Sequence, residues 1–378
     1  MELFSPAEPA PQLCVIVPVY NEAATLPALF SNLESQAGIR FEVILADGGS
    51  ADDTFALGEK FAAAVPFECR VLRANKGRAS QLNVGACHAT APVLLFLHAD
   101  CCFSHPLALA GGLESLATAW EHCGHRRLAG RFSLRFLRQK DKPYQGYFYY
   151  EAKARLNRPQ CVHGDQGFMM AADFFDELGR FDENLPLLED TQLADRVLAV
   201  GQWLLFPADI LTSARRFETE GLVARQCLNA LIVNFAIIGF DAFFEKAAAL
   251  YRTHDQSRPL HLRPFLRLVH QLVRQQSLRR QLGIWYRTGK YVRSQGWQLA
   301  FWADVSRAFK RGVALPEIRT PFLKRFDRVW DAFTDHPLGN GLATVLTAIG
   351  FYLAFAWLAM TESRFFIKVM PLIRGGKS

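Results

Sequence analysis

Two apolar runs of the chain each end abruptly in an acidic residue. Residues 41–47 read FEVILAD and are followed by GGS, and residues 92–100 read PVLLFLHAD. Apolar runs of this length are typical of parallel strands that are covered on both faces. The acids would then lie at the carboxyl ends of the strands, which is the edge where open α/β sheets bind ligands. The pattern therefore predicts an α/β fold with a ligand site beside Asp47 and Asp100.

The first hundred residues alternate between short apolar strands and helical patterns. This βαβαβαβ order predicts a parallel sheet with right-handed crossovers. The pattern loosens after Asp100, where we expect a more varied set of strands and helices. The predicted strands are residues 14–18, 41–46, 68–74, 93–97, 128–136, 168–171 and 203–206, and the predicted helices begin near residues 23, 51, 78, 106, 144, 189 and 222.

The front and the back of the chain differ in charge. The formal net charge of +7 divides into −7 for residues 1–250 and +14 for residues 251–378. We therefore predict a flexible lead at residues 1–12, an α/β domain at residues 13–250 and a basic helical region at residues 251–378. A region that is both basic and apolar suits an anionic membrane surface, and no nucleic-acid-binding module is recognisable, so we expect no nucleic-acid partner.

One segment of the basic region is a candidate membrane element. Residues 337–360 are 24 uncharged residues, which is long enough to cross about 30 Å of hydrocarbon. A transmembrane or re-entrant helix, an interfacial helix and a buried helix all remain open, and flanking positive charges on both sides give no orientation. The start of the chain does not read as a signal peptide, and the eight cysteines lack metal-like spacing. We expect the α/β domain in the cytoplasm, at the inner face of the plasma membrane.

Six motifs in a fixed order carry a family resemblance. They are CVIVPVYNE, VILADGGSADDT, GRASQLNVG, FLHAD, GDQG and LED. In this order they resemble the family 2 glycosyltransferases, and more closely a compact bacterial subgroup of them with GDQ and SARR segments. The resemblance covers about residues 13–220 and leaves the basic region uncovered. It implies a GT-A-like fold, a UDP- or GDP-sugar donor, a divalent cation (Mg²⁺ or Mn²⁺) and inverting transfer to an acceptor hydroxyl.

The resemblance also implies which residues bind the nucleotide. Pro18, Tyr20 and Glu22 would line the nucleotide site at the first strand-to-helix turn. Asp47 would hold the base or the ribose, and Arg78 would reach the nucleotide from the next helix. The residue types allow plainer interpretations, in which Asp47 only shapes the turn before Gly48-Gly49 and Arg78 is an exposed cation at a helix start.

The catalytic assignments follow in the same way. Asp100 would bind the cation that bridges the donor diphosphate, and Asp190, with Glu189 beside it, would deprotonate the acceptor. Hard cations prefer carboxylate oxygens, and a base must reach the proton that it removes. The family has an acid two residues before its metal-binding aspartate, but this chain has His98 there, which makes metal dependence less secure. Glu189 and Asp190 could instead be acids favoured by a helix N-terminus.

Further polar residues leave two interpretations open. Asp165 and Gln166 could contact the acceptor or the donor, or could shape their loop. Arg215 and Arg216 could grip the diphosphate, since guanidinium matches phosphate geometry, or could be solvated. An acceptor delivered by the membrane, such as a lipid-linked one, fits the basic apolar region.

Two other enzyme classes and one binding function compete with this interpretation. A nucleotidyltransferase would carry a Gly-rich phosphate loop after the first strand, where this chain has VYNE. A dinucleotide-dependent oxidoreductase would carry G-x-G-x-x-G after a strand, which is absent. A membrane-associated protein that binds nucleotide sugars without turnover stays open because of His98.

Overall fold

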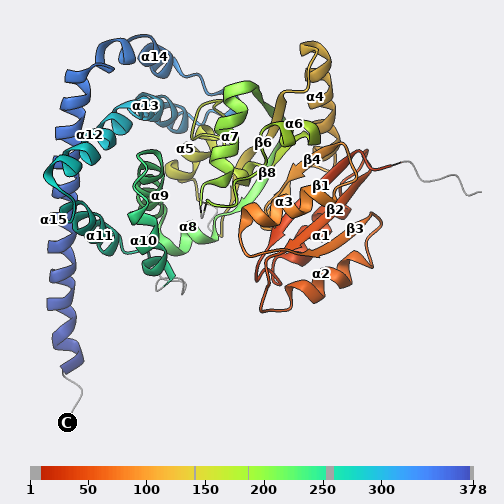
Figure 1. The fold of residues 1–378 in the computed structure, drawn as a ribbon, viewed down its shortest axis with the longest axis horizontal. Helices are drawn as coiled ribbons and strands as arrows, with labels where there is room; N and C mark the ends of the chain where they lie inside the picture. The colour runs from red at the N-terminus through yellow and green to blue at the C-terminus, as the bar shows by residue number, and fades with distance from the viewer. Residues whose placement is uncertain (1–9, 140–141, 186, 253–258, 375–378) are drawn as a thin grey trace, which may run out of the picture. The chain divides into compact units, whose positions relative to one another are not determined.

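The computed structural model describes residues 10–139, 142–185, 187–252 and 259–374, and the chain divides into two compact units (Figure 1). The first unit comprises Met1–Lys142 and Tyr150–Ala214, and the second comprises Pro143–Tyr149 and Arg215–Ser378. Residues 1–9 of the predicted lead lie outside the described residues. The charge change near residue 250, on which the predicted boundary rested, falls inside the second unit.

An eight-stranded sheet forms the centre of the first unit, in the order β3-β2-β1-β4-β7-β6-β8-β5. Its first four strands run parallel and end at one common edge, as predicted. The other half is mixed, because β7 is antiparallel to β4 and β6, and β5 is antiparallel to β8, while β6 and β8 are parallel. The predicted α/β class with a mostly parallel sheet is therefore confirmed. The strands are β1 (Leu13–Val19), β2 (Phe41–Asp47), β3 (Cys69–Arg73), β4 (Val93–Phe96), β5 (Cys101–Phe103), β6 (Leu128–Leu137), β7 (Phe168–Ala171) and β8 (Gln202–Ser213).

Both faces of the sheet are buried, and alternate residues of each strand serve alternate faces. Val15 and Val17 pack into one apolar cluster, whereas Cys14 and Ile16 pack into the other. This two-residue period is that of a pleated strand, and burial of both faces explains why β1 and β2 read as continuous apolar runs. The first face is covered by α1 (Leu26–Glu34), α2 (Thr54–Ala62) and α4 (Ala108–Cys123), and the second by α3 (Arg78–His88), α6 (Ala172–Glu177) and α7 (Glu189–Val200).

Two strands differ from the sequence prediction. The three-residue strand β5 was not predicted, because a segment this short carries no periodic signal. Strand β8 runs to Ser213 rather than ending at residue 206, and its pairing with β6 shifts register between Arg131 and Ser133. That irregularity accommodates the interruption of the apolar pattern by Pro207 and Asp209.

The second unit is helical, as predicted for the back of the chain (Figure 1). Within the described residues, one helical segment, Pro337–Leu358, is long and apolar enough to cross a membrane, judged by length and composition. The helices are α5 (Gln145–Lys153), whose first part is assigned to this unit, α8 (Arg215–Glu220), α9 (Leu222–Ile237), α10 (Ala242–Arg252), α11 (Arg263–Arg274), α12 (Leu278–Ser294), α13 (Trp297–Lys310), α14 (Pro321–Thr334) and α15 (Pro337–Arg374).

Helices α12 and α15 pack closely around a glycine. A Cβ added to Gly289 of α12 would lie 2.4 Å from Cα of Thr344 in α15. Near the same interface the buried Arg293 donates from Nε to Oδ1 of Asn340 at 2.8 Å and pairs with Asp335 at 2.7 Å. The start of α15 is thus fixed to α12 both by close backbone packing and by a buried guanidinium.

Candidate active site

The carboxyl ends of β1 and β2 lead into two turns that are hydrogen-bonded to each other. The N–H of Asn21 donates to Oγ of Ser50 at 2.9 Å, and the N–H of Ala51 donates to Oδ1 of Asn21 at 2.8 Å. Asn21 has a positive φ of 54°, a conformation that asparagine tolerates better than most residues. This reciprocal pair of bonds fixes the two turns in one arrangement at the edge of the sheet.

The first of these turns carries the predicted nucleotide-site residues. Pro18 is half-buried in β1, whereas the ring of Tyr20 is exposed and has Nζ of Lys76 4.0 Å from its centroid. Glu22 accepts a hydrogen bond on Oε2 from the hydroxyl of Thr25 at 2.8 Å. An exposed aromatic ring beside a cation is suited to stacking on a planar base near phosphates. Sequence reasoning missed Lys76, although its place just before Gly77 and Arg78 was a usable signal.

Asp47 closes the turn that follows β2. Its side chain is fully buried and accepts hydrogen bonds from the N–H groups of Gly49 and Ser50, each at 3.2 Å, and from the Ser50 hydroxyl. Nη1 of Arg73 lies 3.9 Å from Oδ2 of Asp47. The turn-shaping interpretation of this acid is therefore observed, and its contact with a nucleotide remains a prediction.

Arg78 and Glu189 form an ion pair between two helix N-termini. Arg78 begins α3 and Glu189 begins α7, and Nη1 of the arginine donates to Oε1 of the glutamate at 3.0 Å. The glutamate side chain is buried, whereas 48% of the arginine side chain is exposed. Burial raises the pKa of Glu189, and the arginine charge opposes that rise. The exposed part of Arg78 leaves its guanidinium able to contact a further anion.

Asp190 is held by the GDQ segment across 26 residues of sequence. The N–H of Gly164 donates to its Oδ2 at 2.7 Å, and the N–H of Thr191 donates to its Oδ1 at 2.7 Å. Burial alone would raise the pKa of Asp190, but His163, Arg78, the Gly164 N–H and His98 outweigh it and hold the pKa below its ordinary value. Asp190 is therefore an ionised carboxylate, the form that a general base requires.

A small cavity brings residues of four segments together. Arg78, His98, Gly164 and Asp190 line it together with apolar side chains such as Leu82 and Phe168. Burial and the neighbouring Arg78 lower the pKa of His98 to about 3, so its imidazole is neutral. A neutral ring can hydrogen-bond a ribose hydroxyl of a bound donor or bind a metal.

Asp100 and Asp165 add two further acids to the same end of the sheet. The thiol of Cys101 lies 3.6 Å from the carbonyl oxygen of Asp165 and 4.0 Å from Oδ1 of Asp100. Burial, followed by the charges of Asp190 and Asp100, raises the pKa of Asp165 to about 7. Oδ1 of Asp165 is buried and has no hydrogen-bond partner among the described residues. This carboxyl group is the most strongly perturbed acid of the site, a common property of functional groups.

Gln166 shapes its loop. Its side chain is fully buried, and it donates from Nε2 to the carbonyl oxygen of Ala154 at 2.6 Å while Oε1 accepts from the N–H of His163 at 3.0 Å. The same Ala154 carbonyl accepts from Nη1 of Arg131, a buried cation that sequence reasoning missed. The loop-shaping interpretation of Gln166 is therefore observed.

Arg215 and Arg216 are the first residues of α8 and belong to the second unit. Nε of Arg216 lies 3.9 Å from Oε1 of Glu220, one helical turn away. Their predicted contact with a diphosphate therefore stays a prediction. The aromatic residues of α5 assigned to this unit pack against other aromatic rings, for example Phe148 against Phe309 at 5.4 Å between centroids.

The acids of the first unit suit a cation that is held partly by its substrate. Among the residues that the structure describes, no three His, Cys, Asp or Glu side chains are arranged to hold a metal ion. Mg²⁺ is usually bound through one or two carboxylates together with substrate phosphates and water, so a complete protein cage is not required. The carboxylate of Asp100 and the buried, unpartnered oxygen of Asp165 offer hard oxygen ligands of this kind. These residues therefore fit a divalent cation that arrives with a diphosphate.

Comparison with known families finds a match over the front part of the chain. The model of glycosyl transferase family 2 matches residues 14–179. The match runs from β1 through α6 and includes Asp47, Arg78, Asp100 and Asp165, but it ends before Asp190.

Curated relatives match over shorter segments. A PGL/p-HBAD biosynthesis glycosyltransferase of Mycobacterium bovis (strain BCG / Pasteur 1173P2) is 37% identical over 92 residues, which is 24% of this chain and 36% of the relative. An undecaprenyl-phosphate 4-deoxy-4-formamido-L-arabinose transferase of Pseudomonas syringae is 34% identical over 91 residues, which is 23% of this chain and 27% of the relative. The chain thus matches about a third or less of the length of these relatives.

Solved structures match over more of the chain at lower identity. Mannosyltransferase PcManGT from Pyrobaculum calidifontis, in complex with GDP-Man and Mn²⁺, is 17% identical with a TM-score of 0.48, covering 93% of this chain and 88% of its own. S. aureus TarS 1-349 in complex with UDP is 16% identical with a TM-score of 0.44, covering 80% of this chain and 92% of its own.

Proposed function

We propose that this chain, in which residues 14–179 match the model of glycosyl transferase family 2, moves a sugar from a nucleotide-diphosphate donor to an acceptor hydroxyl. The observation that carries the proposal is the cluster of Arg78, His98 and Asp190, which line one small pocket at the carboxyl end of the parallel strands. It combines a cation for phosphate, a neutral imidazole and an ionised carboxylate. The carboxylate can take the proton of the acceptor hydroxyl, and the cation can stabilise the charge on the leaving diphosphate.

Asp190 is the proposed general base of a single in-line displacement with inversion. Its low pKa keeps it ionised, and the hydrogen bonds from Gly164 and Thr191 fix both of its oxygens. The acceptor hydroxyl would give its proton to this carboxylate as it attacks the anomeric carbon from the face opposite the diphosphate. Glu189 supports the arrangement by its ion pair with Arg78.

Asp100 is the proposed ligand of the divalent cation, with Asp165 as a second oxygen donor. A bound Mg²⁺ or Mn²⁺ supplies neutralisation of the charge that develops on the leaving diphosphate. Arg78 adds a guanidinium at the same site, and its pKa is raised by the carboxylates of Glu189, Asp190 and Asp100 against the effect of burial. The Mn²⁺ and GDP-Man named for the Pyrobaculum mannosyltransferase are consistent with this choice of cation and donor.

The nucleotide is proposed to bind beside the two linked turns. Tyr20 would stack on the base, with Pro18 and Glu22 lining the same turn and Asp47 holding the base or the ribose from the next. Arg215 and Arg216 remain candidates for the diphosphate. The donor is proposed to be a UDP- or GDP-sugar.

A membrane-delivered acceptor is the proposed second substrate. The apolar segment Pro337–Leu358 and the excess of basic residues after residue 250 favour placement at the cytoplasmic face of the membrane. The Pseudomonas relative is named for an undecaprenyl-phosphate substrate, which supports a lipid-linked acceptor.

The test is release of nucleotide diphosphate from a panel of UDP- and GDP-sugars with Mn²⁺ or Mg²⁺, using membrane lipid extract as the acceptor source. We expect release from one donor that requires the metal and is lost in Asp100→Ala and Asp190→Ala. Asp173→Asn, on the exposed surface of the same unit, is the control and should keep full activity. Donor binding without release under any condition would instead favour the non-catalytic binder, and no donor binding would overturn the roles of Asp47 and Asp100.

A further inference from the structure

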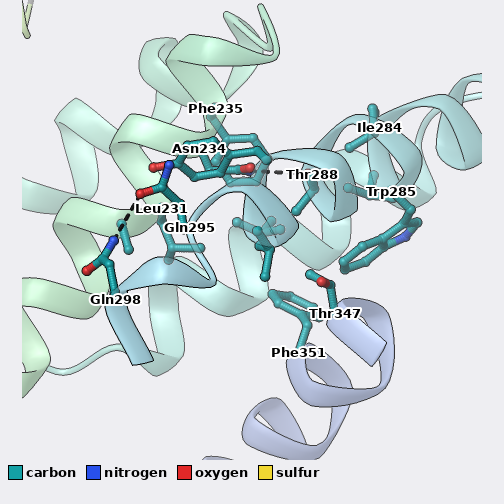
Figure 2. A pocket seen from close by; sticks show the side chains of 15 residues that line it. Leu231, Asn234, Phe235, Ile284, Trp285, Thr288, Gln295, Gln298, Thr347 and Phe351 are labelled. Carbon is teal, nitrogen blue, oxygen red and sulfur yellow. Dashed lines mark hydrogen bonds between the residues drawn. The ribbon is translucent and has the colours of Figure 1, made fainter. Parts of the chain in front are cut away.

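The second unit contains a cavity of about 260 Å³ that is separate from the residues discussed above. Helices α9, α11, α12 and α15 surround it, and Figure 2 shows Phe235, Ile284, Trp285 and Phe351 around its space. Apolar and aromatic side chains dominate the lining. One water molecule takes about 30 Å³ of liquid volume, so the cavity has room for roughly eight groups of that size.

Among the residues that the structure describes, the lining carries no acidic or basic side chain. A charged group placed there would lose its hydration without gaining a counter-charge, which is strongly unfavourable. The lining therefore excludes a phosphate or a nucleotide and selects a neutral, apolar occupant.

One polar group of the cavity lacks a partner. Asn234 is 5% exposed, and its Nδ2 donates to Oγ1 of Thr288 at 3.3 Å (Figure 2). Its Oδ1 is buried and has no hydrogen-bond partner within the described residues. If the oxygen and nitrogen of the amide were exchanged, Oδ1 would face Thr288 and Nδ2 would lack a partner. In either orientation one polar atom of Asn234 can bond to an occupant. A hydroxyl group satisfies both cases, because it donates and accepts.

The cavity also borders the candidate membrane segment. Thr347 and Phe351 line it, and both belong to the apolar segment Pro337–Leu358. A molecule dissolved in a bilayer would meet this helix directly if the segment lies in the membrane. The wall of the cavity and the medium around it would then have the same apolar character.

We propose that this cavity binds the apolar chain of a lipid alcohol, with the alcohol hydroxyl hydrogen-bonded to the side chain of Asn234. The apolar lining accounts for the chain, and the unpartnered amide atom accounts for the hydroxyl. The site lies within the second unit and does not depend on sugar transfer, so binding can be tested without a donor.

The test measures quenching of Trp285 fluorescence in the full chain, held in phosphatidylcholine nanodiscs. The probes are a decanol carrying a terminal bromine and its methyl ether, which accepts a hydrogen bond but cannot donate one. We expect saturable quenching by the alcohol that disappears in Trp285→Phe, and binding of the ether that is weaker by roughly fivefold to tenfold. In Asn234→Leu this preference for the alcohol should fall to about one.

A matched pair of substitutions on α9 separates the cavity from the bilayer. Ala230→Phe adds a ring at a residue that lines the cavity and should weaken alcohol binding at least tenfold, whereas Ala236→Phe, exposed on the same helix, should leave it unchanged. Equal quenching in both variants, or quenching that persists in Trp285→Phe, would mean that the probe only partitions into the bilayer and would overturn the proposal. Alcohol binding that is equally tight in the wild-type protein and in Asn234→Leu would remove the role of Asn234, whereas equal affinity for alcohol and ether in the wild-type protein alone would mean that Nδ2 rather than Oδ1 contacts the occupant.

Discussion

The backbone N–H of Gly164 donates a hydrogen bond to Oδ2 of Asp190 at 2.7 Å. The absence of a side chain makes this approach possible, since a Cβ on Gly164 would lie 3.0 Å from Nε2 of His98 and 3.2 Å from Oδ2 of Asp190. The GDQ segment therefore contributes to the site through the backbone of Gly164 and the carboxyl group of Asp165, while its glutamine is buried in the loop. The bond both orients Asp190 and stabilises its ionised form.

Asp190→Asn should abolish sugar transfer while preserving donor binding. The amide keeps one oxygen for the Gly164 N–H and loses the bond from the Thr191 N–H, so the side chain should stay in place with one hydrogen bond fewer, but it cannot take up a proton. Loss of a general base typically lowers turnover by about 10²- to 10⁴-fold. Turnover and donor affinity should be measured separately, with Asp195→Asn, exposed on the same helix, as the control. Wild-type turnover in Asp190→Asn would assign the base elsewhere, with Asp165 the next candidate.

Asp165→Asn should stabilise the protein at high pH and lower its activity. The pKa of this carboxyl is raised from 3.8 to about 7 in the folded state. Between pH 3.8 and about pH 7 the folded state binds more protons than the unfolded state, so the free energy of unfolding falls as the pH rises. The destabilisation by the ionised carboxylate is complete above about pH 7. A neutral amide removes that cost, because it does not ionise.

Urea unfolding of the full chain without metal or donor measures this effect. We expect the free energy of unfolding to rise by about 2 kcal/mol at pH 8 and by less than half of that at pH 5. Asp173→Asn, which changes an exposed acid, should show the same difference from wild type at both values. A lower free energy of unfolding for Asp165→Asn at pH 8 would contradict the prediction, because it would mean that a favourable contact of the Asp165 carboxylate outweighs the cost of its burial.

Arg78→Gln should destabilise the first unit more than its exposure suggests. Removal of the guanidinium leaves Glu189 buried without its 3.0 Å partner, and such unpaired buried charges are costly. We expect the free energy of unfolding to fall by about 1–3 kcal/mol, which is less than for a fully buried ion pair because the arginine is half exposed. In a double-mutant cycle, Arg78→Gln with Glu189→Gln should cost less than the sum of the two single changes. Simple additivity would mean that the two side chains are not coupled.

The parallel half of the fold was predictable because its signals are local. β1, β2 and β4 are short apolar runs, and the acids that follow β2 and β4 lie at one edge, as their sequence positions required. The mixed half depends on pairings that no local pattern encodes. Strand β5 has three residues and finds its partner β8 more than a hundred residues away.

The site could be predicted as a set of residues but not as a set of contacts. Asp190 and Arg78 were identified from motifs, yet the bond to Gly164 and the pair with Glu189 join segments 26 and 111 residues apart. The protonation states of the site residues could not be predicted from the sequence either, because the neutral state of His98 and the raised pKa of Asp165 arise mainly from burial. Motifs specify residue types, whereas burial and long-range contacts determine their charge.

Two glycines of α12 allow a matched test of how α15 is held. Gly289→Ala would place a Cβ 2.4 Å from the backbone of Thr344, whereas a Cβ on Gly283 of the same helix has no neighbour within 4 Å among the described residues. We expect Gly289→Ala to destabilise the second unit by about 1–3 kcal/mol, because backbone cannot yield as a flexible side chain does. Gly283→Ala should be neutral or stabilising by up to about 1 kcal/mol, since alanine favours helix. Thermal unfolding of the full chain in nanodiscs compares the two, and equal melting temperatures would mean that α12 and α15 are not closely packed there.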